Sequence, residues 1–167
     1  KYSIRHPRPT MPSFLPIDLD PLPEDSPLRL AASARGAVFR GVADEPVTDA
    51  RSDAELAREY IGQGELSPKS IANTQKELYR FLTWCREEAR KNFQELTVAD
   101  LNAYKEFLRT PPPQWVSTTK WPRNDRRYRP FSGPLSDASR RQAMIAVKGL
   151  LGYAEQTGYC LLYTSDA

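Results

Sequence analysis

The stretch Ser67–Arg90, SPKSIANTQKELYRFLTWCREEAR, decides the fold because it combines a helix start signal with two different faces. Ser67 suits the N-cap, where a hydroxyl accepts an unpaired backbone N–H, and Pro68 suits the first helical position, where its missing N–H costs nothing. Apolar residues then recur close to the 3.6-residue period, at Ile71, Leu78, Leu82 and Cys85. We expect a helix that buries this face.

The second face of this stretch is polar and mostly cationic. Lys69, Asn73, Lys76 and Arg80 are spaced i, i+4, i+7 and i+11, so they share one side of a helix. Lysine and arginine neutralise phosphates, and asparagine can pair with an adenine edge in the major groove. The face is therefore a candidate DNA-binding surface. The alternative is an ordinary solvated helix face with charge pairs along it.

Composition places the chain among globular proteins without a membrane span. It has 167 residues, a net charge of +3, 40% hydrophobic and 27% charged residues, which suits one domain plus a tail. No apolar run approaches the roughly 18 residues of a membrane span, and no signal peptide is visible. Two cysteines, Cys85 and Cys160, make no disulfide framework, so we expect a reducing, cytoplasmic location.

Metal and cofactor chemistry has no signal in this sequence. The single histidine, His6, has no cluster of Cys, Asp or Glu around it, and no glycine-rich phosphate loop or catalytic carboxylate pair is present. We expect no metal, no cofactor and no small-molecule substrate. Cys85 and Trp84 are expected to be core residues.

Residues 1–47 have a composition unlike the rest of the chain. They hold eight of the fifteen prolines and six Lys or Arg against six Asp or Glu, with little periodicity. We predict an extended or disordered leader. Phe14, Leu15, Leu28 and Leu30 are its candidates for docking on the domain, at a place that the sequence does not indicate.

Three further helices are expected, over about 51–62, 98–109 and 137–157. Thr48 or Ser52 caps the first, Thr97 with Asp100 caps the second, and Ser136 caps the third. Glycines end the first and third helices. The fold class is therefore all-α, with residues 48–159 as the domain. The inward-facing positions are Leu56, Ala57, Tyr60, Ile61, Val98, Leu101, Tyr104, Phe107, Leu108, Ala143, Val147, Leu150, Leu151 and Ala154.

A long irregular segment separates the second and third of these helices. It ends at Leu135 and carries aromatic residues between its cations. Together with the first turn of the next helix, as residues 111–142, it holds seven Lys or Arg and two Asp, a local charge of +5. Connections of this length are usually functional or disordered, and the aromatic residues predict that part of it packs. Its cations suit a clamp on a nucleic-acid backbone; the alternative is a charged loop that packs its aromatic residues on the domain. They are Lys120, Arg123, Arg126, Arg127 and Arg129.

The start of the last helix is a candidate phosphate site. Ser139, Arg140 and Arg141 lie in its first turn, where free backbone N–H groups point outward. Cations at this end oppose the helix dipole, and a bound anion would reverse that cost.

The order and spacing of these elements resemble the N-terminal core-binding domain of tyrosine recombinases, the phage-type integrases, over about residues 52–159. Residues 129–136, Arg-Pro-Phe-Ser-Gly-Pro-Leu-Ser, resemble integrases of integrative elements and plasmids. Ser70 and Thr74 depart from the family pattern, where threonine and tyrosine are usual. The matching positions are Ser67, Pro68, Phe81, Leu82, Trp84, Leu96, Thr97, Asp100, Leu101, Tyr104, Phe107, Leu108, Pro134, Leu135, Ser136, Ser139, Gly158 and Tyr159.

The resemblance implies a SAM-like bundle of four to five helices that binds one face of double-stranded DNA and contacts other recombinase protomers in a synaptic complex. In the family a separate C-terminal domain carries the catalytic Arg, His and Tyr residues, so we expect this chain to be a non-enzymatic fragment that ends before that domain. Tyr159 and Tyr163 are not expected to be the nucleophile. A helical protein-interaction module without DNA binding is the alternative function, and a free-standing enzyme is a weaker third.

Residues 160–167, CLLYTSDA, resemble the translation of a transposase-type sequencing adapter. We expect them to be a non-native tail, with a short native C-terminal tail as the alternative.

Overall fold

Four α-helices form the structure, a computed structural model that describes residues 11–23, 48, 50–63 and 66–160. The helices are α2 (Asp53–Ile61), α3 (Pro68–Trp84), α4 (Val98–Arg109) and α5 (Asp137–Gln156). Short 3-10 turns span Phe93–Glu95 and Pro113–Trp115. Within the described ranges there is no strand, only one isolated bridge between Val116 and Phe131. The predicted all-α class is confirmed.

Each helix begins at the predicted cap. The side chains of Ser52, Ser67, Thr97 and Ser136 each accept the backbone N–H of the residue three positions on. Asp100 completes a capping box by accepting the N–H of Thr97 at 2.8 Å. Local side-chain chemistry therefore determines where all four helices start.

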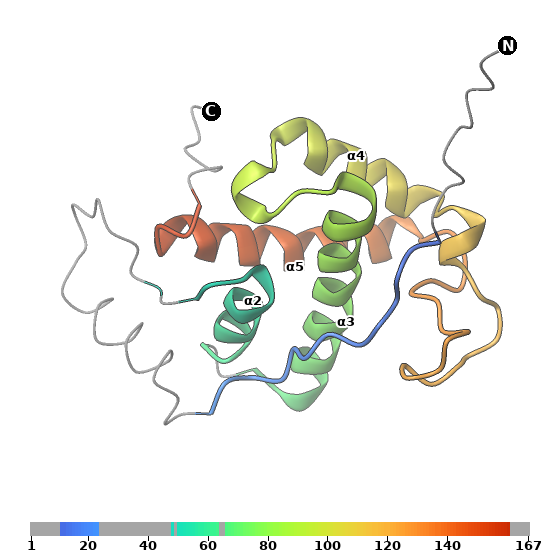
Figure 1. The fold of residues 1–167 in the computed structure, drawn as a ribbon, viewed down its shortest axis with the longest axis horizontal. Coiled ribbons are helices and arrows are strands. Elements are labelled where there is room, and N and C mark those ends of the chain that lie inside the picture. Colours follow the sequence, from blue (N-terminus) through green and yellow to red (C-terminus); the bar gives the residue numbers. More distant parts are fainter. Residues whose placement is uncertain (1–10, 24–47, 49, 64–65, 161–167) are drawn as a thin grey trace, which may run out of the picture.

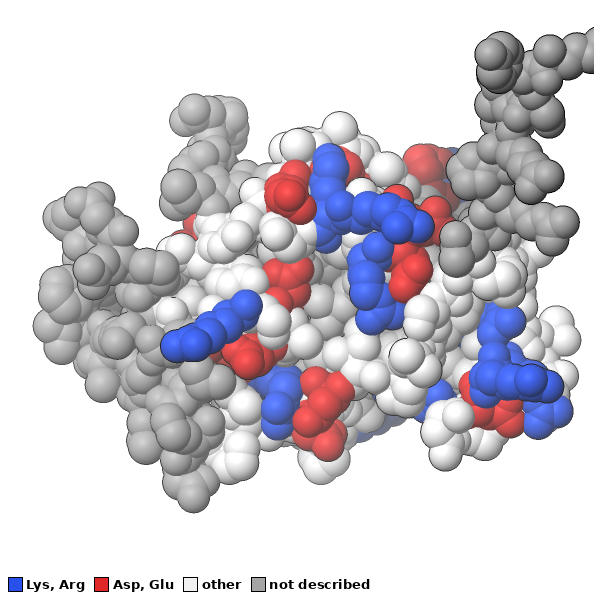
Figure 2. All heavy atoms as spheres, in the orientation of Figure 1, with Lys and Arg blue, Asp and Glu red and all other residues white. Residues whose placement is uncertain are grey.

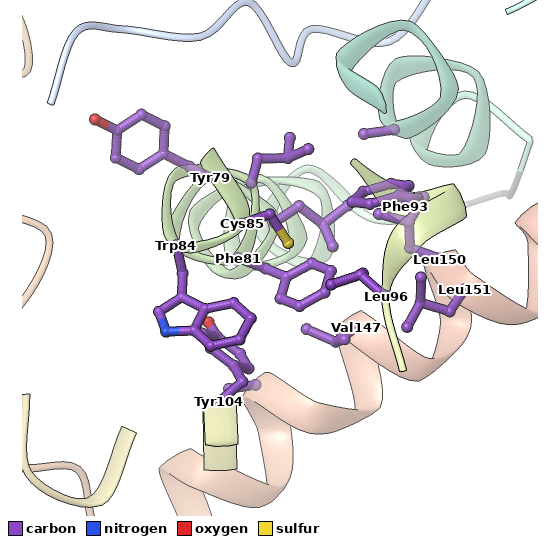
Figure 3. Close-up of a cluster of buried hydrophobic side chains, with 14 of the residues drawn as sticks. Tyr79, Phe81, Trp84, Cys85, Phe93, Leu96, Tyr104, Val147, Leu150 and Leu151 are labelled. Atoms are coloured by element: carbon purple, nitrogen blue, oxygen red, sulfur yellow. The ribbon is translucent and has the colours of Figure 1, made fainter. Parts of the chain in front are cut away.

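The helix α3 is the centre of the bundle. It packs against α2 and α5, while α4 packs against α5, which crosses behind α3 (Figure 1). Figure 3 shows aromatic rings from α3 and α4 meeting between the helices. The ring of Phe81 lies 5.0 Å from Tyr104 and 5.7 Å from Phe93, and Trp84 lies 5.1 Å from Tyr104. These rings are buried, as predicted for Trp84, and Cys85 is buried beside them.

The end of α3 differs from a continuous helix. The α-helical part stops at Trp84, and Cys85–Ala89 form a π-helical turn. Arg90 follows with φ 53°, in the left-handed region that non-glycine residues seldom occupy. The periodicity predicted a helical stretch up to Arg90 but gave no sign of the wider turn.

Residues 11–23 take the extended form, one of the two alternatives predicted for the leader, and the rest of residues 1–47 lies outside the described part. Residues 11–23 run extended across α3 (the blue trace in Figure 1), and Leu19 and Leu22 are buried at 4% and 6% exposure. Phe14 packs on the bundle, whereas Leu15 is exposed. Leu28 and Leu30 lie outside the described residues.

Val98 was expected to face inward, but it is exposed at 67%. It is the first residue of α4, where the capping box turns Thr97 and Asp100 to the helix end and leaves Val98 on the outer side. The other inward-facing predictions are buried or partly buried.

The C-terminal end of α5 is closed by a left-handed glycine. Gly158 has φ 72°, and the N–H groups of Tyr159 and Cys160 both donate to the carbonyl of Ala154. Cys160 is buried, and the rest of the expected non-native tail, residues 161–167, lies outside the described part. None of the helices described here is long and apolar enough to cross a membrane.

Candidate nucleic-acid interface

The polar face of α3 and the first turn of α5 line one hollow of about 350 Å³. Three of the four predicted α3 residues lie in its wall, and Ser139 stands on the α5 side. Lys69, the fourth, is exposed near the N-terminus of α3, outside the hollow. The two helices thus bring predicted residues from distant parts of the sequence together. The lining residues are Asn73, Lys76, Glu77, Arg80, Leu135, Ala138, Ser139 and Gln142.

Arg80 lies in the wall of the hollow, but most of its side chain is covered. Only 11% of its side chain is exposed. Its Nε donates to the carbonyl of Pro130 at 3.0 Å, its Nη1 donates to Glu77 at 3.1 Å, and its guanidinium lies 4.5 Å from the ring centre of Phe131. These contacts fasten the connection before α5 to α3, so Arg80 has a structural role as well as a place in the wall of the hollow.

Glu77 is a functional candidate that the sequence pattern did not indicate. Its side chain is 4% exposed, and its Oε1 pairs with Lys76 at 3.5 Å and Arg80 at 3.1 Å. Its Oε2 has no hydrogen-bond partner among the described residues. This buried carboxylate reduces the positive charge of the hollow, which leaves Lys76, whose side chain is 46% exposed, as the main available cation.

The segment between α4 and α5 is an ordered loop. Its two ends are joined by hydrogen bonds from Ser117 N–H to the Phe131 carbonyl at 2.9 Å and from Phe131 N–H to the Trp115 carbonyl at 3.1 Å. Trp115 is fully buried, and its indole N–H donates to Glu88 at 2.9 Å. The expectation that part of this segment packs is therefore confirmed.

The loop arginines differ in how they are held. Arg127 makes two bonds to Asp125, at 3.0 and 2.9 Å, and lies 3.5 Å from the ring centre of Trp121. Hydrogen bonds from Arg127 hold the pKa of Asp125 at about 2. Arg129 donates to the carbonyls of Arg126 and Tyr128. The side chains of Arg127 and Arg129 are therefore bonded to other residues of the same loop, which restricts the conformations of the loop.

Three cations of the loop remain open to a ligand. Arg123 is exposed and lies 5.6 Å from the ring centre of Tyr79 on α3. The exposed side chains of Lys120 and Arg126 make no hydrogen bond or ion pair with any described residue. Figure 2 shows lysine and arginine over this loop with acidic atoms among them, and a second group of basic side chains over the C-terminal end of α3, flanked by acidic ones.

Arg140 and Arg141 face away from the hollow. They line a second groove, between α4 and α5, and Arg140 pairs with Asp137. The other cations of this groove were not predicted, although Lys105 and Arg109 have the i, i+4 spacing of one helix face. The groove residues are Lys105, Glu106, Arg109, Asp137, Arg140, Arg141, Met144, Ile145 and Lys148.

Tyr159 is held in a way that opposes use as a nucleophile. Its hydroxyl donates to Asp53 at 2.6 Å. Burial raises the pKa of Tyr159, and so does the neighbouring Asp53 carboxylate, because both disfavour the phenolate. Tyr163 lies outside the described residues.

No group of three or more His, Cys, Asp or Glu side chains that could hold a metal occurs within the described ranges. Comparison with protein-family models, curated proteins and solved structures returned no match.

Proposed function

We propose that this domain binds double-stranded DNA, as the core-binding domain of a tyrosine recombinase of the integrase type. The observation that carries the proposal is the hollow in which Lys76 and Asn73 of α3 meet Ser139 of α5. It lies next to the loop between α4 and α5, called the arginine loop after Arg123, Arg126, Arg127 and Arg129. Arg80 lines the hollow and donates to the carbonyl of Pro130 in that loop, so the hollow and the loop are joined at α3.

Binding would rest mainly on phosphate contacts. Lys76, Lys120, Arg123 and Arg126 are exposed cations of this surface, while the exposed Arg127 is paired with Asp125. Asn73 lies in the wall of the hollow, where an amide can pair with a base edge that enters it. The N-cap at Ser136 leaves backbone N–H groups of α5 free for a phosphate at the same place.

In this proposal the chain contributes recognition and clamping, and strand exchange belongs to a separate domain of the parent recombinase. Other protomers in a synaptic complex would be its protein partners. Both statements rest on the resemblance of residues 52–159 to the family.

The test is binding to a short fluorescent duplex measured by anisotropy at several salt concentrations. With four phosphate contacts, the affinity should fall about 100-fold between about 50 and 200 mM salt. Changing Arg126, Arg127 and Arg129 together to glutamate should abolish binding. An affinity that changes neither with salt concentration nor on charge reversal would contradict the proposal.

The α4–α5 groove favours a second candidate, a protein-interaction module. Ile145 is 70% exposed and Met144 lines the same groove, among Lys105, Arg109 and Lys148. An exposed apolar residue surrounded by cations suits an acidic amphipathic partner. Reversing Lys105 and Lys148 to glutamate distinguishes the two candidates, because it should leave DNA binding on the other surface largely intact.

A further inference from the structure

The described part of the leader, residues 11–23, is held by buried apolar side chains and also through five of its backbone carbonyls. Side chains of α2 and α3 and of the turn after α3 donate to them, and each bond is independent of which residue carries the carbonyl. The donors are Arg86 to Ser13 at 2.8 Å, Tyr79 to Phe14 at 2.9 Å and to Leu15 at 3.2 Å, Gln75 to Leu19 at 3.1 Å, and Arg58 to Asp20 at 2.9 Å.

The side chain of Phe14 does something different: it reaches the arginine loop. Its ring packs edge-on against Trp115, which closes the base of the loop, with ring centres 4.9 Å apart. The guanidinium of Arg129 lies 5.2 Å from the ring centre of Phe14. Phe14 therefore touches both the base of the loop and one of its cations.

Tyr79 links the leader to the loop a second time. Its hydroxyl donates to the carbonyl of Phe14, while its ring lies 6.1 Å from Tyr128 and 5.6 Å from the guanidinium of Arg123. The leader, α3 and the loop thus meet around two aromatic side chains.

From these contacts we infer that Phe14 is a positioning residue for DNA binding: it holds Arg129 and the base of the loop so that the loop cations face the duplex. The inference rests on the proposed function of the loop. Without the Phe14 ring, Arg129 loses its aromatic neighbour and Trp115 loses a packing partner, so the loop samples more conformations. Binding to DNA must then fix the loop in one conformation, and the entropy lost in doing so lowers the affinity.

The experiment compares three variants of the full chain: Phe14→Ala, Phe14→Tyr and Leu19→Ala. Leu19 is the matched control, because it is a buried leader residue whose carbonyl accepts a hydrogen bond from Gln75 of α3 and which has no hydrogen bond to the described residues of the loop. The first measurement is trypsin cleavage after Arg123, Arg126 and Arg127 in the native protein, identified by mass spectrometry. The second is duplex affinity and its salt dependence.

We expect Phe14→Ala to speed cleavage in the loop at least fivefold and to weaken duplex binding about tenfold. The slope of log affinity against log salt should become shallower by about 0.9 for each phosphate that the loop no longer neutralises. Phe14→Tyr keeps the aromatic ring, so its loop cleavage and its duplex affinity should match those of the unmodified chain. Leu19→Ala should change overall stability without either loop effect.

Equal loop cleavage in the Phe14→Ala and Leu19→Ala proteins would overturn the inference, since it would mean that the loop responds only to overall stability. So would normal duplex affinity in Phe14→Ala. If the unmodified chain binds no DNA, the proposed function fails, and the cleavage measurement still decides whether Phe14 positions the loop.

Discussion

The Nε of Arg80 donates to the backbone carbonyl of Pro130 at 3.0 Å, and this bond joins the centre of the bundle to the loop that precedes α5. The same guanidinium pairs with the buried Glu77. A residue that the sequence pattern assigned to a ligand-binding face therefore holds two parts of the fold together.

Replacing Arg80 with alanine should lower the free energy of unfolding by about 3 kcal/mol, because it leaves the carboxylate of Glu77 buried with its main partner removed. Chemical denaturation checks this value. Lys76→Ala is the control: its exposed ion pair to the same carboxylate should be worth about 1 kcal/mol or less. Lost DNA affinity in Arg80→Ala with unchanged stability would instead make Arg80 a direct DNA contact.

Tyr104→Phe should leave stability unchanged or raise it by about 1 kcal/mol. The hydroxyl of Tyr104 is buried and has no hydrogen-bond partner among the described residues, so removing it removes a desolvated polar group. Tyr159→Phe provides the contrast, because it breaks the 2.6 Å bond to Asp53 and should cost about 1–2 kcal/mol. Thermal unfolding of both variants gives the comparison, and a destabilised Tyr104→Phe protein would mean that the hydroxyl has a partner.

The acid stability of the domain should depend on Asp100. A hydrogen bond from Lys91, followed by bonds from Thr97, lowers the pKa of Asp100 from 3.8. The folded state therefore prefers the carboxylate, and this stabilisation is present above pH 3.8 and is lost as the pH falls through the lowered value. Asp100→Asn should reduce the drop in melting temperature between neutral and strongly acidic solution.

The control for Asp100 is Glu106→Gln, which removes an exposed carboxylate 3.9 Å from Arg109. It should leave the drop in melting temperature between neutral and strongly acidic solution unchanged. An equal drop in melting temperature in the wild-type and Asp100→Asn proteins would contradict the role given to Asp100.

Two glycines near the end of α5 should respond to alanine in opposite directions. Gly158 has φ 72°, so Gly158→Ala should cost about 1 kcal/mol. Gly152 lies within the helix, and an added Cβ there meets no atom within 4 Å, so Gly152→Ala should stabilise by about 0.5–1 kcal/mol. Urea denaturation measures both, and a shift in the same direction for both variants would contradict the left-handed backbone of Gly158.

The helix starts were predictable because they depend on neighbouring residues. Ser67 and Thr97 are recognised from the residues that follow them, and the buried face of α3 follows from spacing alone. The place where Phe14 docks and the bond from Arg80 to Pro130 depend on segments far apart in the sequence, so the local pattern could not indicate them. The π-helical turn after Trp84 had no sign in the periodicity either.

The candidate surface was predictable only in part for the same reason. Helical spacing correctly placed Asn73 and Lys76 on one face, but it could not show that Arg80 on that face is covered by the loop. Arg140 and Arg141 were grouped with Ser139 because they are adjacent in sequence. Successive residues of a helix point in different directions, and the two arginines face the α4–α5 groove instead.

The most direct test of the central claim is duplex affinity, measured with salt as the variable, for the unmodified chain, the loop variant Lys120→Glu/Arg126→Glu and the groove variant Lys105→Glu/Lys148→Glu. We predict strongly salt-dependent binding that the loop variant loses and that the groove variant largely keeps. Binding lost in the groove variant and kept in the loop variant would contradict the claim.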